Sequence, residues 1–84
     1  MRIGDQGGVQ GTAARQLIAI AGSASELARR TGLPVRAIEE AAAGRCSLDR
    51  VLRLIGAWNM HRDTRKRVRL TIEPTRSGQK VTVK

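Results

Sequence analysis

Two short helix-forming segments joined by a Gly-Leu-Pro turn constrain the fold of this chain more than any other feature of its sequence. The first segment starts with a capping box, in which Ser23 is placed to accept a hydrogen bond from the amide of Glu26 while Glu26 reaches back. It ends at Gly32, a residue that tolerates the left-handed backbone of a helix end. Pro34 opens the second segment and Gly44 closes it. Helices this short are unstable alone, so the two must pack against each other and against further elements.

Helical periodicity also precedes and follows this pair. We expect a first helix over 13–21, capped by Thr12 and ended by Gly22, and a fourth helix that Ser47 caps and that runs to about residue 60. The residues expected to point into the core recur at helical spacing: Leu17, Ile18, Ala21, Leu27, Ala28, Leu33, Ile38, Ala41, Leu48, Val51, Leu52, Ile55 and Trp58 or Asn59.

The fourth helix carries more apolar surface than one contact needs. Leu54, Ala57 and Met60 lie partly off its inward stripe. Another element is therefore expected to cover this helix.

Composition changes after the helical part. All eleven alanines lie within 13–57, and residues 61–84 contain none but are rich in Val, Thr, Arg and Lys. Apolar and polar residues alternate at 68–72 and again at 81–83, around a turn at 74–78. This pattern predicts a β-hairpin, or one strand followed by a loose tail. Because a two-stranded hairpin is marginal alone, it must pack on the fourth helix, pair with another chain, or both.

The chain carries a net charge of +9, from sixteen Lys and Arg against seven Asp and Glu. Residues 1–60 hold eight basic and five acidic side chains, whereas residues 61–84 hold eight basic and two acidic, so the C-terminal part carries +6. Residues 1–11 contain four glycines and few bulky apolar side chains, which predicts a flexible arm. The positive charge favours an anionic partner: nucleic acid first, an acidic protein or an anionic membrane surface next.

Several function classes find little support in the composition. Trp58 is the only aromatic residue, whereas proteins that bind RNA or single-stranded DNA by stacking the bases on aromatic side chains need several. The single Cys46 excludes an internal disulfide and fits a reducing cytoplasm, and no apolar stretch approaches the ~20 residues of a membrane span. With His61 as the only histidine and no clustered carboxylates, the chain offers no nucleophile–base pair and no metal-ligand spacing. We therefore expect a cytoplasmic protein that is not an enzyme and holds no metal or cofactor.

The segment from Glu26-Leu-Ala-Arg-Arg-Thr-Gly-Leu-Pro to Ala43-Gly44 resembles the helix-turn-helix of the Cro/phage-repressor (XRE-type) family of small transcriptional regulators. Ala28 is small where the two helices cross, and Ile38 and Ala41 supply the core side of the second helix. The likeness covers about residues 13–60. It implies a mainly α, lambda-repressor-like four-helix domain, to which the strand pattern of residues 61–84 adds a C-terminal β-strand or hairpin. It further implies a homodimeric repressor that binds double-stranded DNA.

In that family the second helix of the motif lies in the major groove. The resemblance places Val35, Arg36 and Glu40 at the groove-facing positions, where Arg36 would hold guanine, Glu40 would accept from cytosine and Val35 would touch a thymine methyl. The residues expected to contact the DNA backbone are Ser23, Ser25 and Arg45 near the motif and Arg62, Arg65, Lys66 and Arg67 after the fourth helix.

This chain departs from the family pattern in its charges. Ala24 and Ala43 stand where phosphate-contacting residues are frequent, and Glu39 and Glu40 place two negative charges where a duplex approaches. An antitoxin that also binds a toxin, and a protein-interaction module that keeps the fold without binding DNA, therefore remain open as alternatives.

The C-terminal strands resemble those of Cro-like repressors and antitoxins in which a strand pairs across a two-fold axis. On this basis we expect Trp58, Val68, Leu70 and Ile72 to form a dimer interface. Pairing of the strands within one chain, as a hairpin that covers the fourth helix, is the alternative.

Overall fold

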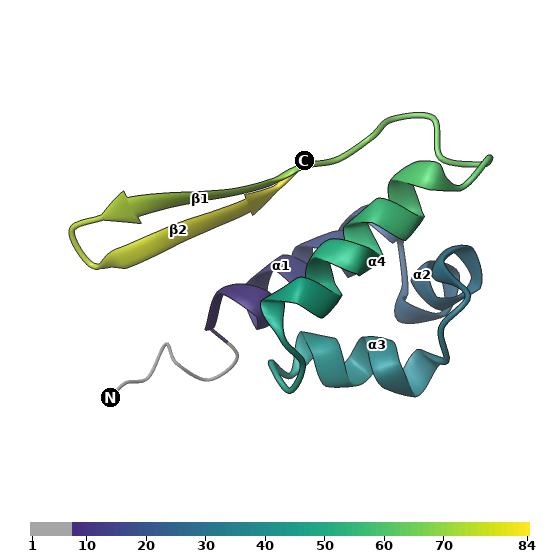
Figure 1. Cartoon of the computed structure of the whole chain (residues 1–84), viewed down its shortest axis with the longest axis horizontal. Coiled ribbons are helices and arrows are strands. Elements are labelled where there is room, and N and C mark those ends of the chain that lie inside the picture. The colour runs from purple at the N-terminus through teal and green to yellow at the C-terminus, as the bar shows by residue number, and fades with distance from the viewer. Residues whose placement is uncertain (1–7) are drawn as a thin grey trace.

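The computed structural model describes residues 8–84, in which four helices precede a two-stranded antiparallel hairpin (Figure 1). The expected mainly helical class with a C-terminal hairpin is confirmed, and the alternative of one strand with a loose tail is wrong. The elements in chain order are α1 (Gly8–Ala21), α2 (Ala24–Thr31), α3 (Val35–Ala42), α4 (Leu48–Met60), β1 (Leu70–Thr75) and β2 (Gly78–Val83).

Helix α1 begins at Gly8, so the predicted cap at Thr12 is wrong. Thr12 lies inside the helix, and its hydroxyl donates to the Gly8 carbonyl at 3.0 Å. Gly11 is buried against the chain after α3, where a Cβ atom would lie 3.3 Å from the backbone of Gly44. The glycines that suggested a loose arm thus include one that permits close packing. Residues 8–11 belong to α1, and the rest of the predicted arm, residues 1–7, lies outside the described residues.

The caps of α2 follow the sequence prediction in two of three points. The Ser23 hydroxyl accepts from the amide of Glu26 at 3.1 Å, and Gly32 ends the helix at φ 76°. The reciprocal half of the capping box is wrong, because the Glu26 carboxylate instead accepts from Arg29 and Arg30. Pro34 is the cap that precedes α3, and its fixed φ suits that position.

The core lies where α1, α2, α3 and α4 meet. Its buried apolar residues are Ala13, Ala14, Leu17, Leu27, Ala28, Ile38, Ala41, Val51, Leu54, Ile55, Trp58, Val68 and Val83.

Two of the predicted core residues point outward. Leu54 is only 2% exposed, whereas Leu52 is 47% exposed. The inward stripe of α4 is therefore rotated toward Val51, Leu54, Ile55 and Trp58, which still follows helical spacing. Leu33, in the extended turn before Pro34, also lies among the exposed apolar residues rather than in the core.

The hairpin has a fixed register. Arg69 and Lys84 exchange both backbone hydrogen bonds, at 3.0 and 3.2 Å, and pairs alternate from there between bonded and non-bonded types. Pro74 falls opposite Gln79 in a non-bonded pair, where β1 needs no N–H toward β2. This explains why Pro74 lies in the strand, whereas the sequence pattern placed it in the turn.

Two side-chain amides attach the hairpin to the helices. Gln16 of α1 donates to the Val81 carbonyl at 2.7 Å and accepts from the Val83 amide at 2.6 Å. Asn59 of α4 makes the same pair of bonds to Val68, both at 2.8 Å. The base of the hairpin is therefore fixed to α1 and α4, while its turn extends away from the helices (Figure 1).

Candidate nucleic-acid interface

Helix α3 presents an open face to solvent. Ile38 and Ala41 are buried, and this side is held against α1 and α2. Val35, Arg36 and Glu40 are exposed, so the structure brings the three predicted base-reading residues together on one side of one helix. In Figure 1, α3 runs along one long side of the molecule with α2 beside it. This face is free to enter a groove.

The charges on this face nearly cancel. Arg36 lies 3.9 Å from the Glu40 carboxylate, four residues along the helix, and its side chain is 89% exposed. Such an exposed pair is weak and opens readily. Glu39 adds a further negative charge to the exposed surface of α3. The exposed face of α3 therefore carries hydrogen-bonding side chains but no net positive charge.

The backbone-contact candidates next to the motif lie at its ends. Ser23 and Ser25 are exposed at the N-terminus of α2, where amides and the helix dipole favour an anion. The Ser23 hydroxyl already accepts one hydrogen bond but retains its own proton to donate. Arg45 is exposed just after α3.

Sequence reasoning missed Arg15, which binds the C-terminal end of α3. Its guanidinium donates to the carbonyl of Ala42 at 2.6 Å and to the Thr12 hydroxyl at 3.3 Å. A cation at this place suits the negative end of the helix dipole and holds α3 against α1. No local pattern indicates the contact, because the two residues lie 27 positions apart.

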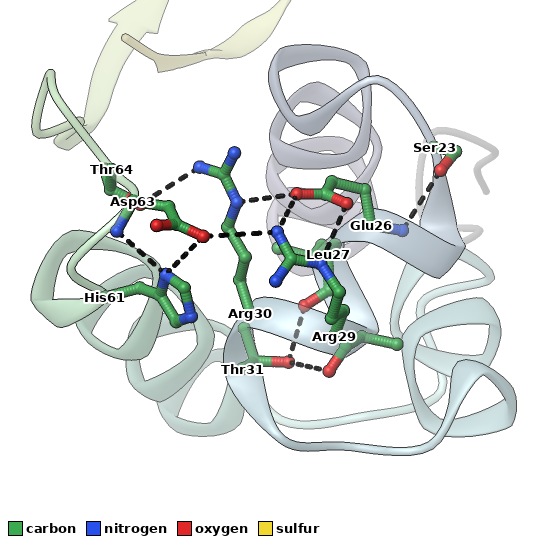
Figure 2. Close-up of polar contacts among 10 residues, drawn as sticks. Ser23, Glu26, Leu27, Arg29, Arg30, Thr31, His61, Asp63 and Thr64 are labelled. Carbon is green, nitrogen blue, oxygen red and sulfur yellow. Dashed lines mark hydrogen bonds and ion pairs between the residues drawn. The ribbon is translucent and has the colours of Figure 1, made fainter.

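A polar network centred on Glu26 fixes α2 (Figure 2). The Glu26 carboxylate accepts from Arg29 Nη2 and from Arg30 Nε, each at 2.7 Å. These bonds lower the pKa of Glu26 from 4.5 to about 2, because Arg29 and then Arg30 favour its charged form. The two arginines are therefore engaged within the molecule.

The same network joins α2 to the chain that follows α4. Arg29 lies 3.5 Å from Asp63, and Arg30 donates to the Thr64 hydroxyl at 3.3 Å (Figure 2). The Arg30 guanidinium also lies 4.4 Å from the centre of the Trp58 ring, in cation–π geometry. The Trp58 indole N–H is buried and has no hydrogen-bond partner within residues 8–84.

The basic stretch after α4 lies away from α3. Arg62, Arg65, Lys66 and Arg67 are all exposed in the segment between α4 and β1. Figure 1 places this segment on the side of the molecule opposite α3, with α4 between them. The structure therefore does not bring these four cations together with the base-reading candidates.

The expected dimerisation residues separate into two groups. Trp58 and Val68 are buried in the core of their own chain, at 5% and 7% exposure. Leu70 is half-buried and Ile72 is exposed, and both lie in β1. Only the second pair offers surface to another chain.

No three His, Cys, Asp or Glu side chains gather as a metal site within the part of the chain that the structure describes. None of its helices is long and apolar enough to cross a membrane. Comparison of the chain with protein-family models, with curated proteins and with solved structures gave no significant match.

Proposed function

We propose that this protein is a sequence-specific double-stranded DNA-binding regulator that acts in the cytoplasm as a homodimeric repressor. The observation that carries the proposal is the open face of α3, on which Val35, Arg36 and Glu40 are exposed while Ile38 and Ala41 anchor the helix. The contact of α2 with α3 and the turn at Gly32 between them support a lambda-repressor-like helix-turn-helix, whose second helix would enter the major groove.

Side-chain contacts hold α2 and α3 in fixed positions, which supports the use of α3 as a recognition helix. Arg29 and Arg30, both bound to Glu26, join α2 to Asp63 and Thr64 after α4, and Arg15 holds the C-terminal end of α3 to α1. A recognition helix fixed in this way loses little conformational entropy on binding. Arg36 leaves its weak pair with Glu40 to bind guanine O6 and N7, and Glu40 then accepts from a cytosine amino group.

The near-neutral α3 face favours one alternative, a protein-interaction module on the same scaffold. Glu39 and Glu40 oppose phosphate approach, and the most basic segment lies on the other side of the molecule. Such a module would bind no duplex even at low salt, which separates it from the proposed function.

The proposal is tested by adding one negative charge to α3. We expect the wild-type protein to bind a random-sequence duplex at low salt, as measured by fluorescence anisotropy, because its charge of +9 favours phosphates. Val35→Glu should weaken this binding at least about tenfold, since it places a carboxylate against the groove. Gln79→Glu, exposed on β2, makes the same charge change elsewhere and should change affinity less than about twofold. Equal loss in both variants, or no binding by the wild type, would refute the proposal.

A further inference from the structure

Strand β1 has one edge whose backbone groups lack partners. In the alternating register of the hairpin, the N–H and C=O groups of Leu70 and Ile72 point away from β2. Within residues 8–84 these groups have no hydrogen-bond partner. On the opposite edge of the hairpin, Gln16 binds the outward carbonyl of Val81 and the outward amide of Val83. Only β1 therefore offers free strand groups at the base of the hairpin.

An open groove runs beside this edge, between β1 and α4. Leu52 and Ile55 of α4 form its apolar side, and Leu70 and Thr71 of β1 also line it. Leu52 is 47% exposed there, so α4 leaves apolar surface uncovered along the groove. An extended chain laid along β1 would bind the free backbone groups and cover this surface, which is the recognition mode called β-strand addition.

The groove is closed at one end. The side-chain amide of Asn59 reaches from α4 to Val68, where it donates to the carbonyl and accepts from the amide, both at 2.8 Å. It thus takes the place that a residue of an added strand would need opposite Val68. An added strand can pair with Ile72 and Leu70, but it has to end, or leave the sheet, opposite Arg69.

The charge at the closed end is positive. Arg67, Arg69 and Lys84 line the groove there, and none of the described residues that line it is acidic. Arg69 also lies opposite Lys84 across the hairpin, a like-charge pair that costs stability. Within residues 8–84, neither Arg67 nor Arg69 forms an ion pair. This end of the groove therefore favours a negative group.

We propose that the groove captures the free C-terminal end of another protein chain, which adds to β1 as a short antiparallel strand. Antiparallel pairing runs the added chain from Ile72 toward Leu70, so its last residue lies opposite Arg69. Its terminal carboxylate, charged at neutral pH, then lies beside Arg67 and Arg69. A parallel strand would instead bring an N-terminal amine to these cations. The inference goes beyond the proposed function and does not depend on it.

An internal strand suits this edge less well than a chain end does. In antiparallel pairing, β1 of a second copy would continue past Arg69 and meet Asn59 at Val68. It would also bring no carboxylate to the cations at the closed end. The end of a chain satisfies both conditions at once.

The pairing also specifies the side chains of the bound chain. Residues opposite Leu70 and Ile72 share the face on which Leu70 packs toward the helices, so they have to be apolar to cover Leu52. The residue opposite Glu73 suits a cation, and the last residue, opposite Arg69, suits an acidic side chain. The expected ligand is therefore a C-terminus of the pattern Lys-Val-Thr-Val-Glu, in which the two valines face the groove.

Binding of a labelled peptide tests the site. The probe is the peptide Lys-Val-Thr-Val-Glu with a fluorescent N-terminus and a free C-terminal carboxylate, and its matched control ends in an amide. Fluorescence anisotropy should show at least about tenfold tighter binding of the free acid, because charge-assisted hydrogen bonds are the strong ones. Arg69→Gln should remove most of this preference. Arg76→Gln, exposed in the turn of the hairpin, should change it less than about twofold.

Backbone methylation of the probe tests the strand pairing. N-methylation of its second valine, opposite Leu70, removes an N–H that points at β1 and should weaken binding at least about tenfold. N-methylation of its threonine, opposite Thr71, removes an N–H that points away from β1 and should change affinity less than about threefold. In nuclear magnetic resonance spectra, the amides of Leu70 and Ile72 should shift when the free acid binds.

Several outcomes would overturn the inference. Equal binding of acid and amide would show that the groove does not read a chain end, and failure of the free acid to bind up to about 1 mM would show that it captures no such peptide. A wild-type dimer whose Leu70 and Ile72 amides resist hydrogen exchange before peptide is added would show that a second copy fills the edge. No DNA is present in these measurements, so their failure would leave DNA binding by α3 untouched.

Discussion

At the residue scale, Glu26 binds Arg29 and Arg30, whose side chains also bind Asp63 and Thr64 after α4. Its pKa of about 2 lies below the ordinary 4.5, so its contribution to stability is fully present above about pH 4.5 and is lost as the pH falls toward 2. Glu26→Gln should lower stability at pH 7 and flatten the decline between these pH values, as measured by urea unfolding. Glu39→Gln, an exposed carboxylate on α3, is the control. If the stability of Glu26→Gln fell with pH as steeply as that of the wild type, Glu26 would not be the source of this pH dependence.

In the proposed function Arg36 serves recognition rather than folding, since its side chain is 89% exposed and its ion pair with Glu40 is weak. Arg36→Ala should leave the melting temperature within about a degree, because alanine is the better helix former. It should lower discrimination at one base pair per half-site by about 1–3 kcal/mol, as measured by competition with single-base variants of a bound site. The control is Arg53→Ala, which removes a similarly paired cation from α4. Equal discrimination by the two variants would contradict the reading role of Arg36.

At the scale of elements, the hairpin depends on two amide side chains. Gln16→Ala and Asn59→Ala should each destabilise the protein by about 1–3 kcal/mol, because each leaves a partly buried N–H and C=O without a protein partner. Hydrogen exchange should show faster exchange of the Val83 amide in the first variant and of the Val68 amide in the second. Gln79→Ala, exposed on β2, should change neither. Unchanged protection in both variants would show that packing alone holds the hairpin.

The same elements show what the sequence predicts and what it does not. Ser23 and Gly32 mark the ends of α2, Pro34 precedes α3 and Ser47 starts α4, so these three helices were predictable from local sequence. The start of α1 was not, because it depends on Gly11 meeting Gly44, a contact between distant residues. The bonds of Gln16 to β2 span 65 and 67 positions and leave no local pattern.

The candidate site divides in a similar way. The exposed face of α3 follows from helical spacing, since Ile38 and Ala41 fix which side is buried. The pairing of Arg29 and Arg30 with Glu26 follows from their spacing of three and four residues within α2. The burial of Trp58, by contrast, depends on how the helices pack against one another. Spacing within α4 does not contain that information, so the sequence placed Trp58 in a dimer interface instead.

At the scale of the whole molecule, most of the positive charge lies apart from the exposed face of α3 that we propose reads DNA. Residues 61–84 carry +6 of the +9, and Figure 1 places the linker before β1 on the side opposite α3. A helix of ~10 Å diameter lies between them, which exceeds the ~8 Å Debye length at 0.15 M salt. A duplex held by α3 is therefore screened from these cations in the same protomer.

Replacing Arg65, Lys66 and Arg67 by Gln tests this segregation. At 0.15 M salt the affinity for a selected site should change less than about twofold, whereas at 0.01 M, where the Debye length is ~30 Å, all duplexes should bind more weakly. Anisotropy titrations across this range measure both effects. A large loss of DNA affinity at 0.15 M salt would contradict this expectation. If the slope of log affinity against log salt also fell by about the number of cations removed, the basic stretch after α4 would contact DNA directly.

Selection of bound sites from a random duplex library tests the central claim most directly. A dimer that places one α3 in each of two successive major grooves should enrich a two-fold symmetric site. Its half-sites should lie about one helical turn, ~10–10.5 base pairs, apart, with a guanine in each that Arg36→Ala no longer selects. A library that emerges without enrichment, or with a site that Arg36→Ala selects equally well, would contradict DNA reading by α3.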